Sequence, residues 1–310
     1  MTAGISGGIG IGGFTCVPGD LTRRAEDIAG FDARWHALLP DTAFEKMGCG
    51  TFSAMSRPVV EHVTDCVTAV LADRGLAPED VDRLVVATSD ACLERLDADV
   101  AVQVLAATGM TRCVPTLLSH LQCCSSLEAL RYGWQLFDDP AIEHVVVVAV
   151  DFTPDDLDRV RSFAVFGDAA AGCLISRTPG PGSVELLASA TTVDHAGLLG
   201  EDSFRSRQQA ATSALDTVFA RTGEQLQKVA KVFGSNLYVP VATFNAMAAG
   251  VPRGQLHFQE TMQRHGHCGN ADWILNLVDH AAGAPLGPGE LYVALSSAPG
   301  FFACTLLRGL

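Results

Sequence analysis

The stretch Ser119-His-Leu-Gln-Cys-Cys-Ser-Ser-Leu-Glu-Ala-Leu130 places two adjacent cysteines directly before an apolar run with helical spacing. The run continues to Trp134 and Leu136, which predicts a buried helix that begins just after the cysteines. A helix N-terminus carries a partial positive charge and unpaired N–H groups, so a thiol held there shifts toward the nucleophilic thiolate. The alternative is that Cys123 and Cys124 are small core residues, because free cysteine is among the most buried residue types.

Outward from this stretch, the chain alternates between predicted helices and predicted strands. Apolar residues at helical spacing, with Pro58 at the start and Gly75 after the end, predict a helix over residues 58–75. An uninterrupted β-branched run predicts a strand buried on both faces over residues 144–150. The same criteria predict strands over residues 5–14, 83–89, 184–194, 231–234, 291–295 and 304–307, and helices over residues 97–108, 205–221, 238–249 and 269–282.

The clearest break in this pattern is Thr178-Pro-Gly-Pro-Gly182, a cluster of turn-forming residues. We expect it to separate an N-terminal half, residues 1–178, from a C-terminal half, residues 179–310. Both halves alternate strands and helices, which predicts an α/β architecture with sheets sandwiched by helices. In the second half, Asn270 is the expected N-cap of the helix over residues 269–282.

The composition restricts the class of protein. The 310 residues are 48% hydrophobic, which is enough for a large core and excludes a disordered chain. A net charge of −14 argues against non-specific binding to nucleic acid or to an anionic membrane surface. No apolar run reaches about eighteen residues, so we expect no membrane span. The N-terminus also lacks the features of a signal peptide.

The cysteines indicate a reducing environment. Ten cysteines without a C-x-x-C spacing do not form a disulfide framework in a chain of this length, so we expect a soluble, cytoplasmic protein. His265-Gly-His267-Cys268 groups three potential metal ligands. No second cluster with zinc-like spacing accompanies them, and no metal site is predicted.

Five short motifs follow one another along the chain. They are Cys123 with Leu127-Glu-Ala-Leu130, Phe166-Gly-Asp-Ala-Ala-Ala171, Ser235-Asn236, Gly266-His267 and Gly300-Phe301. In this order and at this spacing the sequence resembles β-ketoacyl-acyl-carrier-protein synthase III of the thiolase superfamily. The resemblance implies an α/β, thiolase-like αβαβα five-layered fold of two pseudo-repeated halves. It places the nucleophilic cysteine in the first half and the catalytic histidine in the second, and it implies a homodimer.

The resemblance assigns further roles. Cys123 matches the family's nucleophile, which takes an acyl group from coenzyme A or a carrier protein, while Cys124 stays the alternative nucleophile. Gly300 matches a glycine whose backbone N–H joins that of Cys123 in an oxyanion hole. Trp35 falls roughly where the family stacks a tryptophan on the adenine of coenzyme A, although a core aromatic fits the position equally well. No resident cofactor is implied, because the coenzyme A or phosphopantetheine thioester is the substrate.

The sequence departs from the family at two positions, where the family's condensing enzymes carry a histidine and an asparagine as N–H donors to an enolate. Ser235 occupies the histidine position and His267 the asparagine position. This pattern is similar to a divergent branch of secondary metabolism that includes acyltransferases acting on small molecules. In that setting we expect His267 to accept the thiol proton and later to deprotonate an incoming hydroxyl or amine.

Asn236 and Asp272 are the expected partners of His267. We expect Asn236 to fix the imidazole or the substrate, and Asp272 to orient His267 as a third member. The alternative for Asp272 is a first-turn acid that the helix dipole favours. His265 is expected to be structural.

The expected function is an acyltransferase that moves an acyl group from acyl-CoA or an acyl carrier protein, through Cys123, to an oxygen or nitrogen of a small molecule. The alternatives are a carbon–carbon condensing enzyme with a rearranged site, and a catalytically silent subunit of a thiolase-fold heterodimer. The family docks its carrier protein on basic residues just after the position of Asn236, and residues 237–241 contain none. Two pairs are the candidate substitutes: Arg205 with Arg207, and Arg159 with Arg161.

Overall fold

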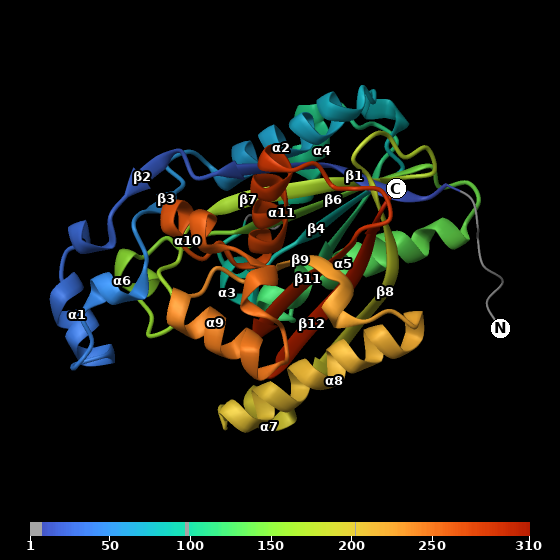
Figure 1. The fold of residues 1–310 in the computed structure, drawn as a ribbon. Coiled ribbons are helices and arrows are strands. Elements are labelled where there is room, and N and C mark those ends of the chain that lie inside the picture. Colours follow the sequence, from blue (N-terminus) through green and yellow to red (C-terminus); the bar gives the residue numbers. More distant parts are fainter. Residues whose placement is uncertain (1–7, 97–98, 202) are drawn as a thin grey trace.

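The computed structural model describes residues 8–96, 99–201 and 203–310. Their centre is a ten-stranded mixed sheet with the order β10-β9-β11-β12-β8-β1-β7-β6-β4-β5 (Figure 1). The first half of the chain supplies β1 (Gly10–Pro18), β4 (Arg83–Ala87), β5 (Val114–Leu118), β6 (His144–Asp151) and β7 (Ala169–Ser176). The second half supplies β8 (Val184–Val193), β9 (Val229–Phe233), β10 (Leu256–His257), β11 (Leu291–Ala298) and β12 (Phe301–Gly309).

The two halves repeat one topology. Read outward from the middle of the sheet, the first half runs β1-β7-β6-β4-β5 and the second runs β8-β12-β11-β9-β10. In both, the first two pairings are antiparallel and the last two are parallel. The halves join where Ile11 of β1 pairs with Val184 of β8. The predicted boundary after residue 178 falls in the connection between β7 and β8.

Helices form three layers around the two halves of the sheet. α2 (Val59–Arg74) and α4 (Val100–Thr108) cover the outer face of the first half, above the sheet in Figure 1. α8 (Phe204–Thr222) and α9 (Val239–Ala248) cover the outer face of the second half. α5 (Ser125–Gln135) and α11 (Asp272–Gly283) contact strands of both halves and form the middle layer.

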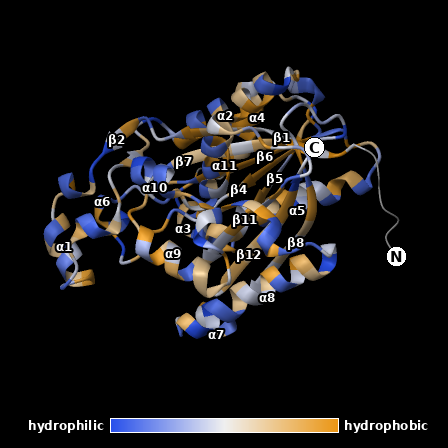
Figure 2. Cartoon of the chain, in the orientation of Figure 1, coloured by the Kyte–Doolittle hydropathy of each residue, from blue (hydrophilic) through white to orange (hydrophobic). Residues whose placement is uncertain are grey.

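Three hydrophobic cores fill the spaces between these layers. The central core joins Leu127 and Leu130 of α5 and Ile274 of α11 to strand residues from both halves. One outer core packs α2 and α4 on the first half, and the other packs α8 on the second half. Figure 2 shows the strands between the layers as predominantly hydrophobic. This arrangement is the predicted five-layered αβαβα fold.

Most predicted elements form close to their predicted bounds. α2 ends at Arg74, and the next residue, Gly75, adopts a φ of +61°, as expected of a C-cap glycine. β1 extends to Pro18, and the opening residues 5–7 of the predicted first strand lie outside the described residues. Residues 97–98 of the predicted helix over 97–108 also lie outside them.

The small-residue run Ala169–Ser176 was not predicted as a strand, yet it forms the central strand β7. The sequence patterns also missed several short elements. They are α1 (Phe31–Leu38), the paired strands β2 (Leu21–Arg23) and β3 (Phe52–Ala54), α3 (Asp90–Leu93), β5, α7 (His195–Leu198), β10 and α10 (Gln259–His265). The charged segment after β6 forms a short helix, α6 (Asp156–Arg159). Among the described residues, none of the helices combines the length and the apolarity that crossing a membrane requires.

Candidate active site

The two adjacent cysteines have different environments. They lie in a single 3-10 turn, Gln122–Cys124, that leads directly into α5. Cys124 is fully buried in the central core, and burial raises the pKa of its thiol to about 12. Cys123 is half-buried and faces a cavity. Of the two thiols, Cys123 is therefore the one that a substrate can reach.

The turn before Cys123 is strained. His120 and Gln122 have φ angles of +69° and +51°, a left-handed conformation that non-glycine residues rarely adopt. Asp90, the first residue of α3, holds this backbone. Its carboxylate accepts hydrogen bonds from the backbone N–H of His120 (2.6 Å) and from Nε2 of Gln122 (3.1 Å). Strain of this kind persists where the surroundings fix it, and it clusters at functional sites.

His267 faces the thiol from the second half of the chain. Its Nε2 lies 3.6 Å from Sγ of Cys123, and its Nδ1 lies 2.5 Å from Oδ2 of Asp272. Both His267 and Asp272 are buried. Asp272 is the first residue of α11, so it occupies the first turn of a helix and also bonds the imidazole. The structure thus brings the predicted residues Cys123, His267 and Asp272 into one line of contacts.

Burial and charge oppose one another at both titrating groups. Burial lowers the pKa of His267, but the Asp272 carboxylate outweighs it, so the pKa lies well above the ordinary value of 6.5. Burial raises the pKa of the Cys123 thiol above 9.0, and the contact with His267 offsets part of that rise. Asp272 therefore favours the protonated imidazole, which is the state that His267 reaches after taking the thiol proton.

Asn236 supports Asp272 rather than touching the imidazole. Its backbone N–H donates to Oδ2 of Asp272 (2.7 Å), and the N–H of Cys268 donates to Oδ1 (2.7 Å). The side chain of Asn236 is buried, and its Oδ1 accepts a hydrogen bond from Asn276 (3.0 Å). Asn236 does not line the cavity, whereas its neighbour Ser235 does.

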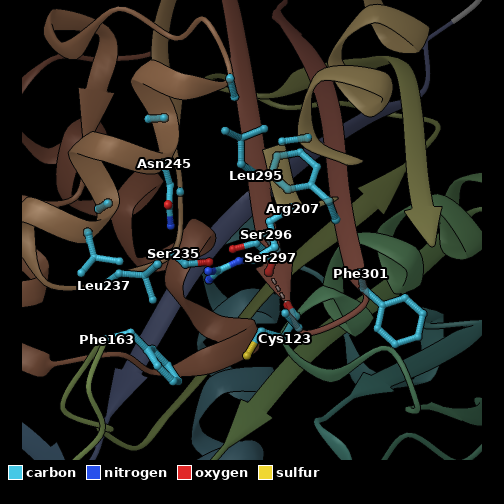
Figure 3. A pocket seen from close by; sticks show the side chains of 18 of the residues that line it. Cys123, Phe163, Arg207, Ser235, Leu237, Asn245, Leu295, Ser296, Ser297 and Phe301 are labelled. Carbon is cyan, nitrogen blue, oxygen red and sulfur yellow. Dashed lines mark hydrogen bonds between the residues drawn. The ribbon is translucent and has the colours of Figure 1, made fainter. Parts of the chain in front are cut away.

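The cavity beside Cys123 has a volume of about 320 Å³. α8, α9, β11 and β12 supply most of its walls, and the two helices also contact each other through Phe204 and Phe244. In Figure 3 the sulfur of Cys123 lies at one end of the cavity, with Phe163 and Phe301 on either side and Asn245 farther away. Alanine and phenylalanine are the most frequent residues in its lining. The polar side chains on its walls include Gln122, Asp194, Arg207, Gln208, Ser235, Asn245, Ser296 and Ser297.

Two glycines are required by close backbone approaches at the site. Gly300 has a φ of +77° in the turn between β11 and β12, and it lines the cavity together with Cys123. A Cβ there would lie 2.8 Å from the backbone nitrogen of Leu198. A Cβ on Gly167 would lie 1.9 Å from the carbonyl oxygen of His265. Because Gly167 has no side chain, its N–H can donate to the carbonyl of His267 (3.0 Å).

The expected stacking of Trp35 on the adenine of coenzyme A is contradicted by the packing around the indole. Trp35 is 7% exposed and belongs to an aromatic cluster with Phe31, Phe44 and Tyr238. Its Nε1 donates to the carbonyl of Thr42 (2.7 Å). Its neighbours cover the ring, so Trp35 is a core aromatic, the alternative for this position.

One candidate pair for carrier docking is also corrected. Arg159 is buried and forms two hydrogen bonds to the carboxylate of Asp168, at 2.6 and 2.9 Å. It therefore braces the Phe166–Ala171 motif from inside and offers no charge to a partner. Arg161 is half-buried and pairs with Asp158. Arg205 and Arg207, on the first turns of α8, are exposed.

The residues that the structure groups as potential metal ligands do not include the thiol or His267. Nδ1 of His265 is 2.9 Å from the hydroxyl of Ser53, so this histidine has a structural partner. Among the described residues, the group whose ligand atoms come within 4.8 Å of one another is His257, Glu260 and Asp279. None of the three lines the cavity.

Sequence reasoning misjudged Asn270, which is not the N-cap of its own helix. Its Oδ1 instead accepts the backbone N–H of Ser126 in the first turn of α5 (2.8 Å). Sequence reasoning also missed Asp151. Its buried carboxylate accepts the backbone N–H groups of Ser89 (2.8 Å) and Asn270 (2.7 Å). Asp151 ends the β-branched strand β6, and its position directly after that run was the signal available.

Comparison with known proteins agrees with this architecture. No family model matches the chain. A curated β-ketoacyl-acyl-carrier-protein synthase III from Cereibacter sphaeroides is 24% identical over 266 residues, which cover 78% of this chain and 81% of that protein. Two further proteins of the same description, from other strains of the species, match to the same extent.

Solved structures resemble the chain over nearly its whole length. ChlB3, described as an acyltransferase, superimposes with a TM-score of 0.81 at 17% identity and 98% coverage of both chains. The 3-oxoacyl-acyl-carrier-protein synthase III of Aquifex aeolicus gives 0.80 at 17% identity, covering 97% of this chain and all of that one. OleA of Xanthomonas campestris gives 0.80 at 13% identity, covering 97% and 98%. The chain thus has the thiolase fold of these structures, and its sequence is similar to that of the synthase III proteins.

Proposed function

We propose that the chain is a cysteine acyltransferase that moves an acyl group from a thioester to an oxygen or nitrogen of a small molecule. The observation that carries the proposal is the line of contacts from Cys123 Sγ to His267 Nε2 (3.6 Å) and from His267 Nδ1 to Asp272 (2.5 Å). A thiol, a base and a group that orients the base are the parts of nucleophilic catalysis. The likeness to the acyltransferase ChlB3 supports the same interpretation.

In the first half-reaction the sulfur of Cys123 attacks the thioester carbonyl as its proton passes to His267. The backbone N–H groups of Cys123 and Gly300 hold the oxyanion of the tetrahedral intermediate. When the intermediate collapses, the carbon–sulfur bond to the carrier breaks and the leaving thiolate takes the proton from His267. The donor is acyl-CoA or an acyl carrier protein, and the thioester enters as a substrate rather than as a resident cofactor.

In the second half-reaction His267 takes a proton from the acceptor's hydroxyl or amine, which attacks the carbonyl carbon of the acyl group on Cys123. An ester or amide forms, the carbon–sulfur bond to Cys123 breaks, and His267 returns the proton to the sulfur. A condensing enzyme needs N–H donors to an enolate, whereas Nδ1 of His267 is committed to Asp272 and Ser235 stands where the family has its second donor. Acyl transfer is therefore the better supported reaction, and carbon–carbon condensation is the alternative.

Product analysis separates these two reactions. The protein is incubated with a malonyl thioester labelled in the free carboxyl group and with a panel of hydroxyl and amine acceptors. Acyl transfer retains the label in an ester or amide. Release of labelled carbon dioxide that depends on Cys123 overturns the acyltransferase proposal and supports the condensing enzyme.

We further propose that the protein is a cytoplasmic homodimer that pairs through β5. This strand is the free edge of the first half of the sheet. Val114 and Leu117 on β5 and Val102 on α4 are exposed large apolar residues at this edge. Exposed apolar edge strands promote pairing with another chain. Sedimentation analysis tests the proposal: wild type should sediment as a dimer and Val114→Lys as a monomer, and a monomeric wild type contradicts it.

A further inference from the structure

Asn270 lies between His267 and Asp272 in the sequence, and its side chain reaches the turn that carries the thiol. It is fully buried. Its Nδ2 donates to the backbone carbonyl of Gln122 (3.0 Å), and its Oδ1 accepts the backbone N–H of Ser126 (2.8 Å). One amide therefore holds the chain on both sides of the reactive cysteine.

The residue that Asn270 holds is one of the two in the left-handed conformation. Gln122 keeps a φ of +51° because several groups fix it together. Its carbonyl accepts hydrogen bonds from Asn270 and from the hydroxyl of Ser125 (2.9 Å), and its side chain donates to Asp90. Of these three partners, Asn270 is the one that belongs to the second half of the chain, so its removal breaks a link between the halves at the strained turn.

Asn270 is itself fixed to the central sheet. Its backbone N–H and its Nδ2 both donate to Oδ2 of Asp151, at 2.7 and 2.9 Å. Asp151 ends β6 in the first half of the chain and is buried. A Cβ on Gly269 would lie 2.0 Å from the same carboxylate oxygen, so the neighbouring glycine permits this close approach.

We infer that Asn270 is a positioning residue that sets the distance between Cys123 and His267. The thiol and the imidazole belong to opposite halves of the chain, and Asn270 links the segment of the imidazole directly to the turn of the thiol. A separation of 3.6 Å leaves little room for displacement, since a shift of about 1 Å at a reacting group can reduce a rate about 100-fold. The inference rests on the proposed function only in taking Cys123 as the reactive thiol.

The test measures the thiol directly. The folded protein is treated with iodoacetamide across a range of pH, and alkylation of the peptide that contains Cys123 is followed by mass spectrometry. The charged groups that face this thiol are His267 and Asp151. In Asn270→Ala we expect the midpoint of the pH profile to rise by about one unit and the rate at pH 7 to fall about tenfold, because the thiolate loses its imidazole partner.

Two further variants keep the test decisive. Val232→Ala removes buried volume from the outer core of the second half, so it lowers stability without touching the site, and its alkylation profile should match wild type. Asn270→Ser leaves a smaller void than alanine and cannot reach Gln122 and Ser126 together, so it should shift the profile in the same direction. A folded Asn270→Ala or Asn270→Ser protein with the wild-type midpoint and rate overturns the inference.

This readout is independent of acyl transfer. A wild-type protein that accepts no acyl group from any thioester contradicts the proposed function, and the alkylation profile of Asn270→Ala still decides the role of Asn270. Where acylation does occur, we expect Asn270→Ala to slow acylation of Cys123 at saturating thioester, with little change in the thioester concentration that gives half the maximal rate.

Discussion

The carboxylate of Asp272 bonds Nδ1 of His267 at 2.5 Å, which leaves Nε2 as the ring nitrogen that faces the thiol of Cys123. Because Asp272 also accepts the N–H groups of Asn236 and Cys268, its position is fixed independently of the imidazole. The imidazole is thus held by a rigid acceptor on one side and presented to a sulfur on the other. This arrangement supports the proposed role of His267 as the base that takes the thiol proton.

Replacing Asp272 by asparagine keeps the size of the side chain and weakens the base, and it leaves one of the two backbone N–H groups without an acceptor. The amide lacks the charge that holds the pKa of His267 above its ordinary value, so less of the thiol proton passes to the imidazole. We expect acylation of Cys123 to slow by about 100-fold or more, measured by time-resolved intact mass. Asp279→Asn is the matched control. Asp279 also bonds a histidine, His257, at 2.8 Å, but it does not line the cavity. Equal rates for the two variants would contradict the role of Asp272.

The reactivity of Cys123 should increase with pH. Burial raises the pKa of this thiol above 9.0 and the contact with His267 lowers it, so the thiolate is the minor form at neutral pH and grows as pH rises. The rate of iodoacetamide alkylation should therefore climb through pH 7 to 9. In His267→Ala the lowering contribution is lost, so the profile should move to higher pH and the rate at pH 8 should fall. A profile unchanged by His267→Ala would show that the imidazole does not act on the thiol.

Adding a methyl group at Gly167 should destabilise the fold near the site. The new Cβ would lie 1.9 Å from the backbone carbonyl of His265, and backbone atoms cannot move aside as a flexible side chain can. We expect Gly167→Ala to lower the free energy of unfolding by about 3 kcal/mol, measured by denaturant titration. Gly254→Ala is the control, because a Cβ on Gly254 would meet no atom within 4 Å, and its stability should remain close to wild type. A Gly167→Ala protein as stable as Gly254→Ala would contradict the close approach.

Replacing Arg159 should destabilise the fold, because a buried carboxylate then lacks its counter-charge. Its guanidinium forms two hydrogen bonds to Asp168, and both side chains are almost completely buried. Arg159→Ala leaves Asp168 without its cation, which should lower the free energy of unfolding by about 3–5 kcal/mol. Arg161→Ala breaks the more exposed pair with Asp158 and should change the free energy of unfolding by less than about 1 kcal/mol. A similar decrease in the free energy of unfolding in the two variants would contradict the larger contribution of the buried pair.

Most long elements were predictable because their patterns are local, whereas the small residues of β7 gave no strand signal. The β-branched run of β6 and the helix α2, bounded by Pro58 and Gly75, carry their signals in consecutive residues. β5 was missed because its edge position exposes Val114 and Leu117, so it shows neither strict alternation nor a fully buried run. β10 has two residues, too few for any periodicity.

Part of the site was likewise predictable from local patterns, and part was not. The residue types and spacing of the motifs led to Cys123, His267 and Asp272, and the structure brings these three together. The role of Trp35 was misjudged because residues 20–57 carry no motif that fixes their register, and only packing decides which face of the indole is free. The hydrogen bonds of Asn270 to Asp151 and Ser126 join residues 119 and 144 positions apart, and no local pattern records them.

Acylation of Cys123 tests the central claim most directly. The protein is incubated with a panel of acyl-CoA and acyl-carrier thioesters and examined by intact mass, with Cys123→Ala and Cys124→Ala alongside. The account predicts a single acyl adduct on wild type and on Cys124→Ala, and none on Cys123→Ala. An adduct that survives in Cys123→Ala and disappears in Cys124→Ala would contradict it, as would the absence of any adduct across the panel.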